Sequence, residues 1–296
     1  RCLQQGSENA AGEVDQIPDL CVKKVIIAVI LCISWELNAQ VALPTFQGVQ
    51  ASAGGCSICD TDLVLYYDFE SGTGSVSDLG ISGNETNGTF QGDADYYSSG
   101  KYGNYSMQSP ASSDYNDYLD ITGDITDLDM TSGYSFMAWV KILGGSGGQG
   151  IIVLGACCSA SGNTNETGRQ GYVLTIVSNG TLRFWGGSIS NDTNYNTYYS
   201  TSINNGNWRH IGVRVNSSQL QILVDGSVVT TNTSSASNIP TSPSKANTNN
   251  SYGKNNPQIG GDGIHGVGFN VLIDEVRVYK EYLSDDDWSS AKSGAW

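Results

Sequence analysis

The stretch from Gly171 to Val229 decides the fold. It opens with the alternating run Tyr172-Val-Leu-Thr-Ile-Val177, breaks at Ser178-Asn-Gly180, and resumes with Thr181-Leu-Arg-Phe-Trp185. An Asn-Gly pair between two alternating apolar runs is the strongest short-range hairpin signal, because both central residues of a type I′ turn need a positive φ. This first half of the stretch therefore predicts a β-hairpin.

The second half of the stretch repeats the pattern. The run Trp208-Arg-His-Ile-Gly-Val-Arg-Val215 places its aliphatic residues on one face. Leu220-Gln-Ile-Leu-Val224 does the same, and Asp225-Gly226 then turns the chain into Ser227-Val-Val229. Alternation with a period of two, interrupted by turn residues, predicts an antiparallel sheet with one buried face.

Motifs in this stretch resemble the laminin-G-like, concanavalin A-like jelly-roll family. The likeness rests on the order Gly-Tyr-x-Leu-x-Ile, Asn-Gly-x-Leu-x-Phe, Asn-Trp-x-His-Ile-x-Val and Leu-x-Ile-x-Val-Asp-Gly. Further segments similar to the family are Leu63–Phe69, Tyr134–Val140, and Ile273–Tyr279 followed by Leu283-Ser284. The resemblance runs from Asp62 to Ala291. It implies an all-β fold, an antiparallel two-sheet β-sandwich of jelly-roll type, in one domain over residues 62–296.

Composition excludes some classes of partner. The chain has 296 residues and a formal net charge of −15. Nucleic-acid binding needs a basic footprint, so we expect no nucleic-acid partner. Attraction to anionic membrane surfaces is disfavoured for the same reason. An acidic surface rich in Asn, Ser, Thr and Gly is typical of an extracellular protein.

The N-terminal residues resemble an export leader. Lys23-Lys24 precedes the apolar run Val25–Trp35, and Leu37-Asn-Ala-Gln40 is similar to a cleavage site. We therefore predict a signal peptide over 22–39, with 1–21 as untranslated or disordered sequence before it. The run is short for a bilayer span, so we expect no membrane insertion after leader removal; a retained anchor or buried helix is the alternative.

Four cysteines remain after such cleavage. Cys56 and Cys59 lie in an extension over 40–61, whereas Cys157 and Cys158 are adjacent in the domain. Adjacent cysteines do not match a zinc knuckle, and export favours disulfides over a metal site. Three pairings are open, and each would tie the extension to the domain or close a local loop.

The candidate ligand site is aromatic. Trp185 ends a predicted strand, and the polar segment Ser188–Asn207, which we interpret as a long loop, supplies further candidates: Tyr195, Tyr198, Tyr199 and Asn191. Aromatic faces pack against the C–H groups of sugars, and polar neighbours bind hydroxyls. A core position for Trp185 is the alternative. Asn-x-Ser/Thr sequons also recur, which would make the protein a glycoprotein in a host with that chemistry.

Calcium is the candidate cofactor. The family resemblance implies a structural Ca²⁺, an ion that takes carboxylate and carbonyl oxygens. The candidate ligands are Asp68, Asp78, Asp93 and Asp274. No EF-hand spacing joins them, and the alternative is that they are solvated or cap turns.

Catalysis finds little support in the sequence. Glycosidases need two opposed carboxylates, and the Glu-x-Asp-x-x-Glu pattern of jelly-roll glucanases is absent. Asp68 and Glu70 end the first strand at alternate positions and so share a face. Asp274 and Glu275 are adjacent and so point to opposite faces. The glycine-rich segment Gly144–Gly150 is interpreted as a hairpin connection and not as a phosphate loop.

The sequence thus favours a secreted or cell-surface protein that is not an enzyme. Its expected role is to bind glycans or to mediate adhesion to cell-surface or matrix components. The alternative is a subunit that self-associates into an extracellular filament through the extension, since an added strand gives an open-ended contact. A glycan hydrolase is the third hypothesis.

Overall fold

A computed structural model describes residues 62–80, 86–111, 117–121, 128, 130, 133–154, 171–177, 179–187, 195–233, 257–261 and 268–294. All of them belong to the compact unit Ala51–Trp296. The predicted leader, the extension and the four cysteines lie outside the described residues, so the domain boundaries and the disulfides stay predictions.

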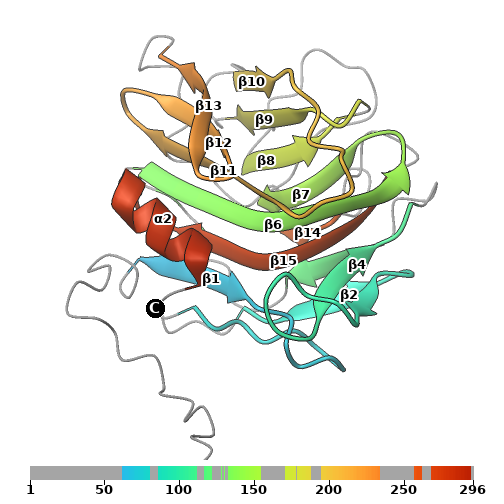
Figure 1. Cartoon of the computed structure of the whole chain (residues 1–296). Helices are drawn as coiled ribbons and strands as arrows, with labels where there is room; N and C mark the ends of the chain where they lie inside the picture. Colours follow the sequence, from blue (N-terminus) through green and yellow to red (C-terminus); the bar gives the residue numbers. More distant parts are fainter. Residues whose placement is uncertain are drawn as a thin grey trace, which may run out of the picture. The chain divides into compact units, whose positions relative to one another are not determined.

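The described part of the chain forms two antiparallel sheets and one helix (Figure 1). In chain order the strands are β1 Leu63–Tyr67, β2 Gly88–Gln91, β3 Asp95–Tyr97, β4 Ser106–Ser109, β5 Tyr118–Ile121, β6 Gly133–Gly145, β7 Gln149–Leu154, β8 Gly171–Ile176, β9 Leu182–Gly187, β10 Tyr195–Tyr199, β11 Arg209–Asn216, β12 Leu220–Val224, β13 Ser227–Asn232, β14 Gln258–Ile259 and β15 Phe269–Tyr279. An eight-stranded sheet has the order β13-β12-β11-β6-β15-β4-β3, with β1 paired to β15. A seven-stranded sheet has the order β10-β9-β8-β7-β14-β5-β2.

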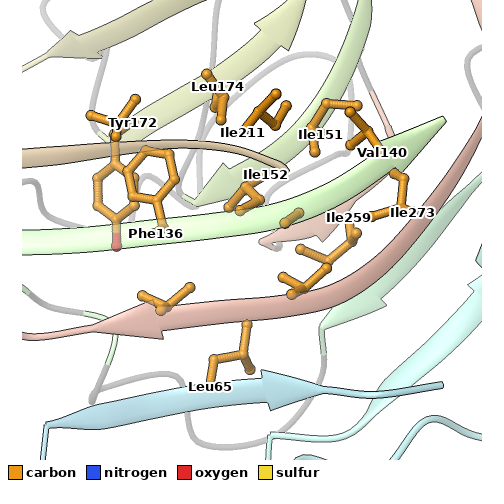
Figure 2. Packing of buried hydrophobic residues seen from close by; sticks show 14 of the residues in the cluster. Leu65, Phe136, Val140, Ile151, Ile152, Tyr172, Leu174, Ile211, Ile259 and Ile273 are labelled. Atoms are coloured by element: carbon orange, nitrogen blue, oxygen red, sulfur yellow. The ribbon is translucent and has the colours of Figure 1, made fainter. Parts of the chain in front are cut away.

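The hydrophobic core lies between the two sheets. Figure 2 shows residues of both sheets that share it, among them Leu65, Val140 and Ile273 from one and Leu174 and Ile259 from the other. Aromatic rings bridge the layers as well. The ring of Phe136 in β6 stacks on that of Tyr172 in β8, with centroids 5.3 Å apart. The antiparallel sheet that the alternation predicts and the two-sheet β-sandwich that the family resemblance implies are both confirmed.

Turn chemistry places two of the hairpins where the sequence predicts them. Strands β8 and β9 pair in register from Gly171↔Gly187 to Ile176↔Leu182, and Gly180 in their turn has φ 79°. Between β12 and β13, Asp225 and Gly226 have φ 53° and 87°. Two successive positive φ values, as at Asp225 and Gly226, are what a type I′ turn requires. In the β8–β9 turn the Gly180 N–H donates to the Val177 carbonyl at 2.7 Å, so Gly180 is the last residue of the turn and not a central residue of the type I′ turn that Asn179-Gly180 predicts.

The segment Gly144–Gly150 is not a hairpin connection, contrary to the sequence prediction. Strand β6 belongs to the eight-stranded sheet and β7 to the seven-stranded sheet, so the segment carries the chain from one layer to the other. Gly144, Gly145 and Gly147 have φ values of 156°, 95° and 124°. Glycine is the residue that tolerates such angles, so a glycine-rich run fits a change of layer as well as it fits a hairpin.

A β-bulge in β15 changes which residues face outward. The register of β15 against β6 shifts between Asp274 and Arg277, and Glu275 has φ 54°. Ile273 and Val276 both face the core, so strict alternation fails between them. The prediction that Asp274 and Glu275 point to opposite faces is therefore wrong, because a bulge places two successive residues on one side of the strand.

The helix α2, Asp285–Ser293, covers the outer face of the eight-stranded sheet (Figure 1). Ser284 caps it by accepting a hydrogen bond from the Asp287 N–H at 3.2 Å. Its buried Trp288 packs in a second apolar cluster with residues of the sheet: Leu63, Met137, Leu223 and Tyr279. The sheet is thus buried on both faces under the helix, where its alternation predicts only one buried face. No helix among the described residues is long and apolar enough to cross a membrane.

Gly212 in β11 makes room for this helix. A Cβ atom there would lie 2.6 Å from Cη2 of Trp288 and 2.5 Å from the carbonyl oxygen of Phe136. Both distances are too short for a carbon contact. We predict that Gly212→Ala lowers the free energy of unfolding by about 1–3 kcal/mol, the usual cost of overpacking. Urea denaturation measures this, with Ser217→Ala in an exposed turn as the control. A Gly212→Ala protein as stable as the wild type would contradict the packing.

Candidate binding surface and the outer-face cluster

The exposed aromatic surface lies on the edge strand β10. This strand pairs with β9, and its Tyr198 lies opposite Arg183. Tyr198 is 53% exposed, and Cζ of Arg183 lies 5.5 Å from the centroid of its ring. Tyr199 is half-buried and packs against the core. An exposed ring beside a guanidinium offers an apolar face together with hydrogen-bond donors.

These tyrosines lie in a strand, where the sequence predicts a loop. Within β10, Thr197 is buried, Tyr198 is exposed and Tyr199 is half-buried. The buried position carries a polar residue, so the sequence shows no apolar alternation that would identify the strand. Two side-chain hydrogen bonds tie β10 to β13, the edge of the other sheet: Asn232 Nδ2 donates to Thr197 Oγ1 at 3.1 Å, and Thr230 Oγ1 donates to the Tyr198 carbonyl at 3.3 Å.

The remaining ligand candidates are placed only in part. Trp185 is in β9, paired with Asn196, and Tyr195 is in β10, paired with Gly186. Asn191 lies outside the described residues. Arg183 was not a candidate from the sequence, because its neighbour Tyr198 is adjacent only through strand pairing. The ligand-binding role of the five candidates stays a prediction.

The four candidate calcium ligands do not come together. No group of three or more His, Cys, Asp or Glu residues suited to a metal was found in the described ranges. Asp78 accepts hydrogen bonds from the N–H groups of Tyr66 and Gly80 at 2.9 and 2.8 Å. Asp68 accepts one from the N–H of Glu70 at 3.0 Å. Asp78 also accepts the Thr86 hydroxyl at 2.5 Å, so its carboxylate joins β1 to the segment before β2, whereas Asp68 closes a local turn.

The other two candidates differ from each other. Asp93 is exposed, and its N–H donates to Asp117 Oδ1 at 2.6 Å. Asp274 is fully buried, and its carboxylate accepts the N–H groups of Lys101 and Tyr102 at 2.6 and 3.3 Å. Calcium binding stays a prediction that the described geometry does not favour at these residues.

The candidate catalytic pair has a structural role. Strand β1 ends at Tyr67, and Phe69 has φ 59°, so Asp68 and Glu70 do not alternate along a strand as the sequence predicts. Glu70 accepts hydrogen bonds from the N–H groups of Asn104 and Tyr105 at 2.9–3.0 Å. A carboxylate engaged in this way positions a loop, and nothing in its contacts prepares it to transfer a proton.

The bulge in β15 gathers charge on the outer face of the eight-stranded sheet. The Glu275 carboxylate forms an ion pair with Arg277 and accepts a hydrogen bond from the Tyr66 hydroxyl at 3.2 Å. The Tyr66 ring lies under the Arg277 guanidinium, 4.4 Å from Cζ to the centroid. Burial raises the pKa of Glu275, although the Arg277 charge lowers it. This cluster was not predicted from the sequence, because it depends on the bulge.

Asp274 beside this cluster is an acid with a strongly raised pKa. Burial and the nearby Glu275 charge raise it from 3.8 to about 8, against three backbone N–H groups that lower it. A raised pKa means that the folded state favours the protonated acid. The resulting stability is complete below the usual pKa and is lost as the pH rises to about 8.

We therefore predict that the wild type loses about 2 kcal/mol of unfolding free energy between pH 6.5 and 9 through this group. Asp274→Asn should remove that part of the pH dependence, since an amide does not titrate. Asp93→Asn, an exposed acid, is the matched control and should leave it intact. Urea denaturation at the two pH values measures the difference. Equal pH dependence in Asp274→Asn and the wild type would refute the assignment.

Several solved structures of similar fold are described as binding domains of toxins. One is the binding domain of botulinum neurotoxin DC in complex with rat synaptotagmin II, at 16% identity and TM-score 0.58 over 81% of this chain and 53% of that chain. Another is the botulinum neurotoxin serotype D ligand binding domain in complex with N-acetylneuraminic acid, at 14% identity and TM-score 0.57 over 80% of this chain and 52% of that chain. A third is the binding domain of Paraclostridial Mosquitocidal Protein 1, at 14% identity and TM-score 0.56 over 79% of this chain and 52% of that chain.

The likeness to these structures concerns the fold, and the chain spans about half the length of the solved chains it matches. A search of curated protein sequences found no match. A family model described as the concanavalin A-like lectin/glucanases superfamily matches residues 113–287, more than half of the chain. With the two antiparallel sheets in place, this match shows that the chain belongs to the concanavalin A-like lectin/glucanases superfamily, within its laminin-G group.

Proposed function

We propose that this protein is a secreted or cell-surface binding module that recognises glycans of cell surfaces or matrix and does not hydrolyse them. The observation that carries the proposal is the pairing of Tyr198 with Arg183 on the edge of the seven-stranded sheet. A sugar ring could pack its C–H face on the exposed tyrosine and accept hydrogen bonds from the guanidinium. Fold alone does not fix function, so the proposal depends on this surface.

Two further observations support a binding role over a catalytic one. Of the candidate carboxylates, Asp68 accepts the N–H of Glu70 in a local turn, and Glu70 accepts the N–H groups of a distant loop at residues 104 and 105. The solved structures of similar fold are described as binding domains, and one of them binds N-acetylneuraminic acid. The leader-like sequence before residue 40 supports export.

We predict that Tyr198→Ala weakens glycan binding roughly tenfold or more, because it removes the stacking face. Tyr97→Ala is the matched control. It removes another exposed tyrosine, 37% accessible, on β3 at the far edge of the eight-stranded sheet. Binding to a glycan array that includes sialylated and neutral oligosaccharides identifies the ligand, and calorimetry with that ligand gives the affinities. Equal losses in the two variants, or no bound glycan, would contradict the proposal.

The same preparation distinguishes the other hypotheses. Release of oligosaccharide products that disappears in Glu70→Gln would favour a hydrolase over a binding module. Loss of binding on addition of a chelator, restored by Ca²⁺, would establish the calcium that the family resemblance implies.

A further inference from the structure

His210 is buried on the outer face of the eight-stranded sheet, between the sheet and helix α2. Its ring lies 5.2 Å from that of Trp139 in β6 and 5.7 Å from that of Trp288 in α2, centroid to centroid, and both contacts are edge-on. Among the described residues, neither of its ring nitrogens has a hydrogen-bond partner. A neutral imidazole tolerates this apolar site far better than an imidazolium, which carries two N–H donors and a charge.

The charged groups that face His210 make protonation harder still. Arg277 approaches from β15 and Lys292 from α2, and both lower the pKa of His210, which burial has already lowered well below its usual value. Lys101 lies over the Trp139 ring, 4.3 Å from its centroid. Three acids lie on this face. Asp225 is paired with Arg209 at 2.8 Å and accepts the backbone N–H of His210. Glu275 is paired with Arg277, and Asp274 accepts the N–H groups of residues 101 and 102.

Helix α2 is short, and it is held by two buried side chains and by polar contacts at its two ends. It has nine residues, and its buried side chains are Trp288 and Ala291. Its polar attachments join both ends of the helix to the rest of the domain: Arg214 to Asp285 at 2.7 Å, Arg277 to the Ala291 carbonyl at 2.8 Å, and Lys292 to the Asp225 carbonyl at 2.9 Å. The Lys292 carbonyl also accepts the Tyr102 hydroxyl at 3.3 Å and Trp139 Nε1–H at 3.4 Å. A helix of this length is marginal in water by itself, so its order depends on docking.

We propose that helix α2 is an acid-released strap, in which protonation of His210 expels Trp288 and undocks the helix while the two sheets stay folded. The released helix exposes His210 to water, where the imidazolium is solvated. It also uncovers the apolar outer face that the helix protects, including Met137, Leu223 and Tyr279.

Acid weakens the docking of α2 because the docked state holds His210 in its neutral form. An exposed histidine has a pKa near 6.5, and the docked state lowers it. Docking is therefore unaffected above that pH and weakens as the pH falls below it. The undocking equilibrium shifts by up to tenfold per pH unit below that value, which amounts to about 30-fold between pH 7.5 and 5.0.

Hydrogen–deuterium exchange at pH 7.5 and 5.0, corrected for the intrinsic pH dependence, tests the proposal on the full chain. The amides of α2 should lose about 30-fold in protection at pH 5.0, while those of β6 and β11 keep theirs. His210→Leu should abolish the loss. His265→Leu, a substitution of the chain's other histidine, is the control and should keep it. If His210→Leu does not fold, a fluorinated histidine that stays neutral at pH 5.0, incorporated in the His265→Leu background, replaces it.

Three results would overturn the proposal. Unchanged protection of α2 at pH 5.0 would show that the helix does not respond to acid. Simultaneous loss in α2 and both strands would show global unfolding in place of release of a strap. Release that persists in His210→Leu would place the trigger on another group.

Discussion

The bulge at Glu275 is the constraint on which the outer face of this domain depends. A regular strand would send every second residue of β15 into the core, and one member of the Asp274–Glu275 pair would be buried among aliphatic side chains without donors. The positive φ of Glu275 keeps Ile273 and Val276 in the core and both carboxylates outside it. Asp274 then binds the backbone of residues 101 and 102, and Glu275 pairs with Arg277, which in turn reaches the C-terminal helix.

This arrangement gives the two sheets different roles. The outer face of the eight-stranded sheet is covered by other parts of the same domain: helix α2 packs on it, and Asp274 binds the loop at residues 101 and 102. Its charged groups are paired or face backbone N–H groups, so they contribute to order more than to chemistry. The seven-stranded sheet ends in β10, with an exposed aromatic ring beside a guanidinium. Ligand recognition in this account belongs to that edge.

The sequence predicts much of the fold because hairpin signals are local. Asn179-Gly180 and Asp225-Gly226 specify their turns through φ preferences that need no tertiary context. The bulge could not be predicted, since alternation identifies a strand and does not reveal a single extra residue. The strand β10 was missed because Thr197 is buried without being apolar. The covering of Met137 and Leu223 by α2 was missed because single apolar residues on an outer face are common on exposed sheets.

The sequence allowed the types of residue in the candidate site to be predicted, but not which of them lie next to each other. Aromatic and acidic residues can be counted in the sequence, but Tyr198 and Arg183 meet only through strand pairing. Likewise, Asp78 is a candidate metal ligand in the sequence. Its carboxylate accepts the N–H groups of Tyr66 and Gly80, and the first of these partners is brought close only by the fold.

The most direct test of this division of roles is to map a bound glycan by NMR on the ¹⁵N-labelled protein. The account predicts that shift changes concentrate in β9 and β10, around Arg183 and Tyr198, and that β15 and α2 do not respond. Changes centred on the outer face of the eight-stranded sheet, with β10 silent, would contradict it.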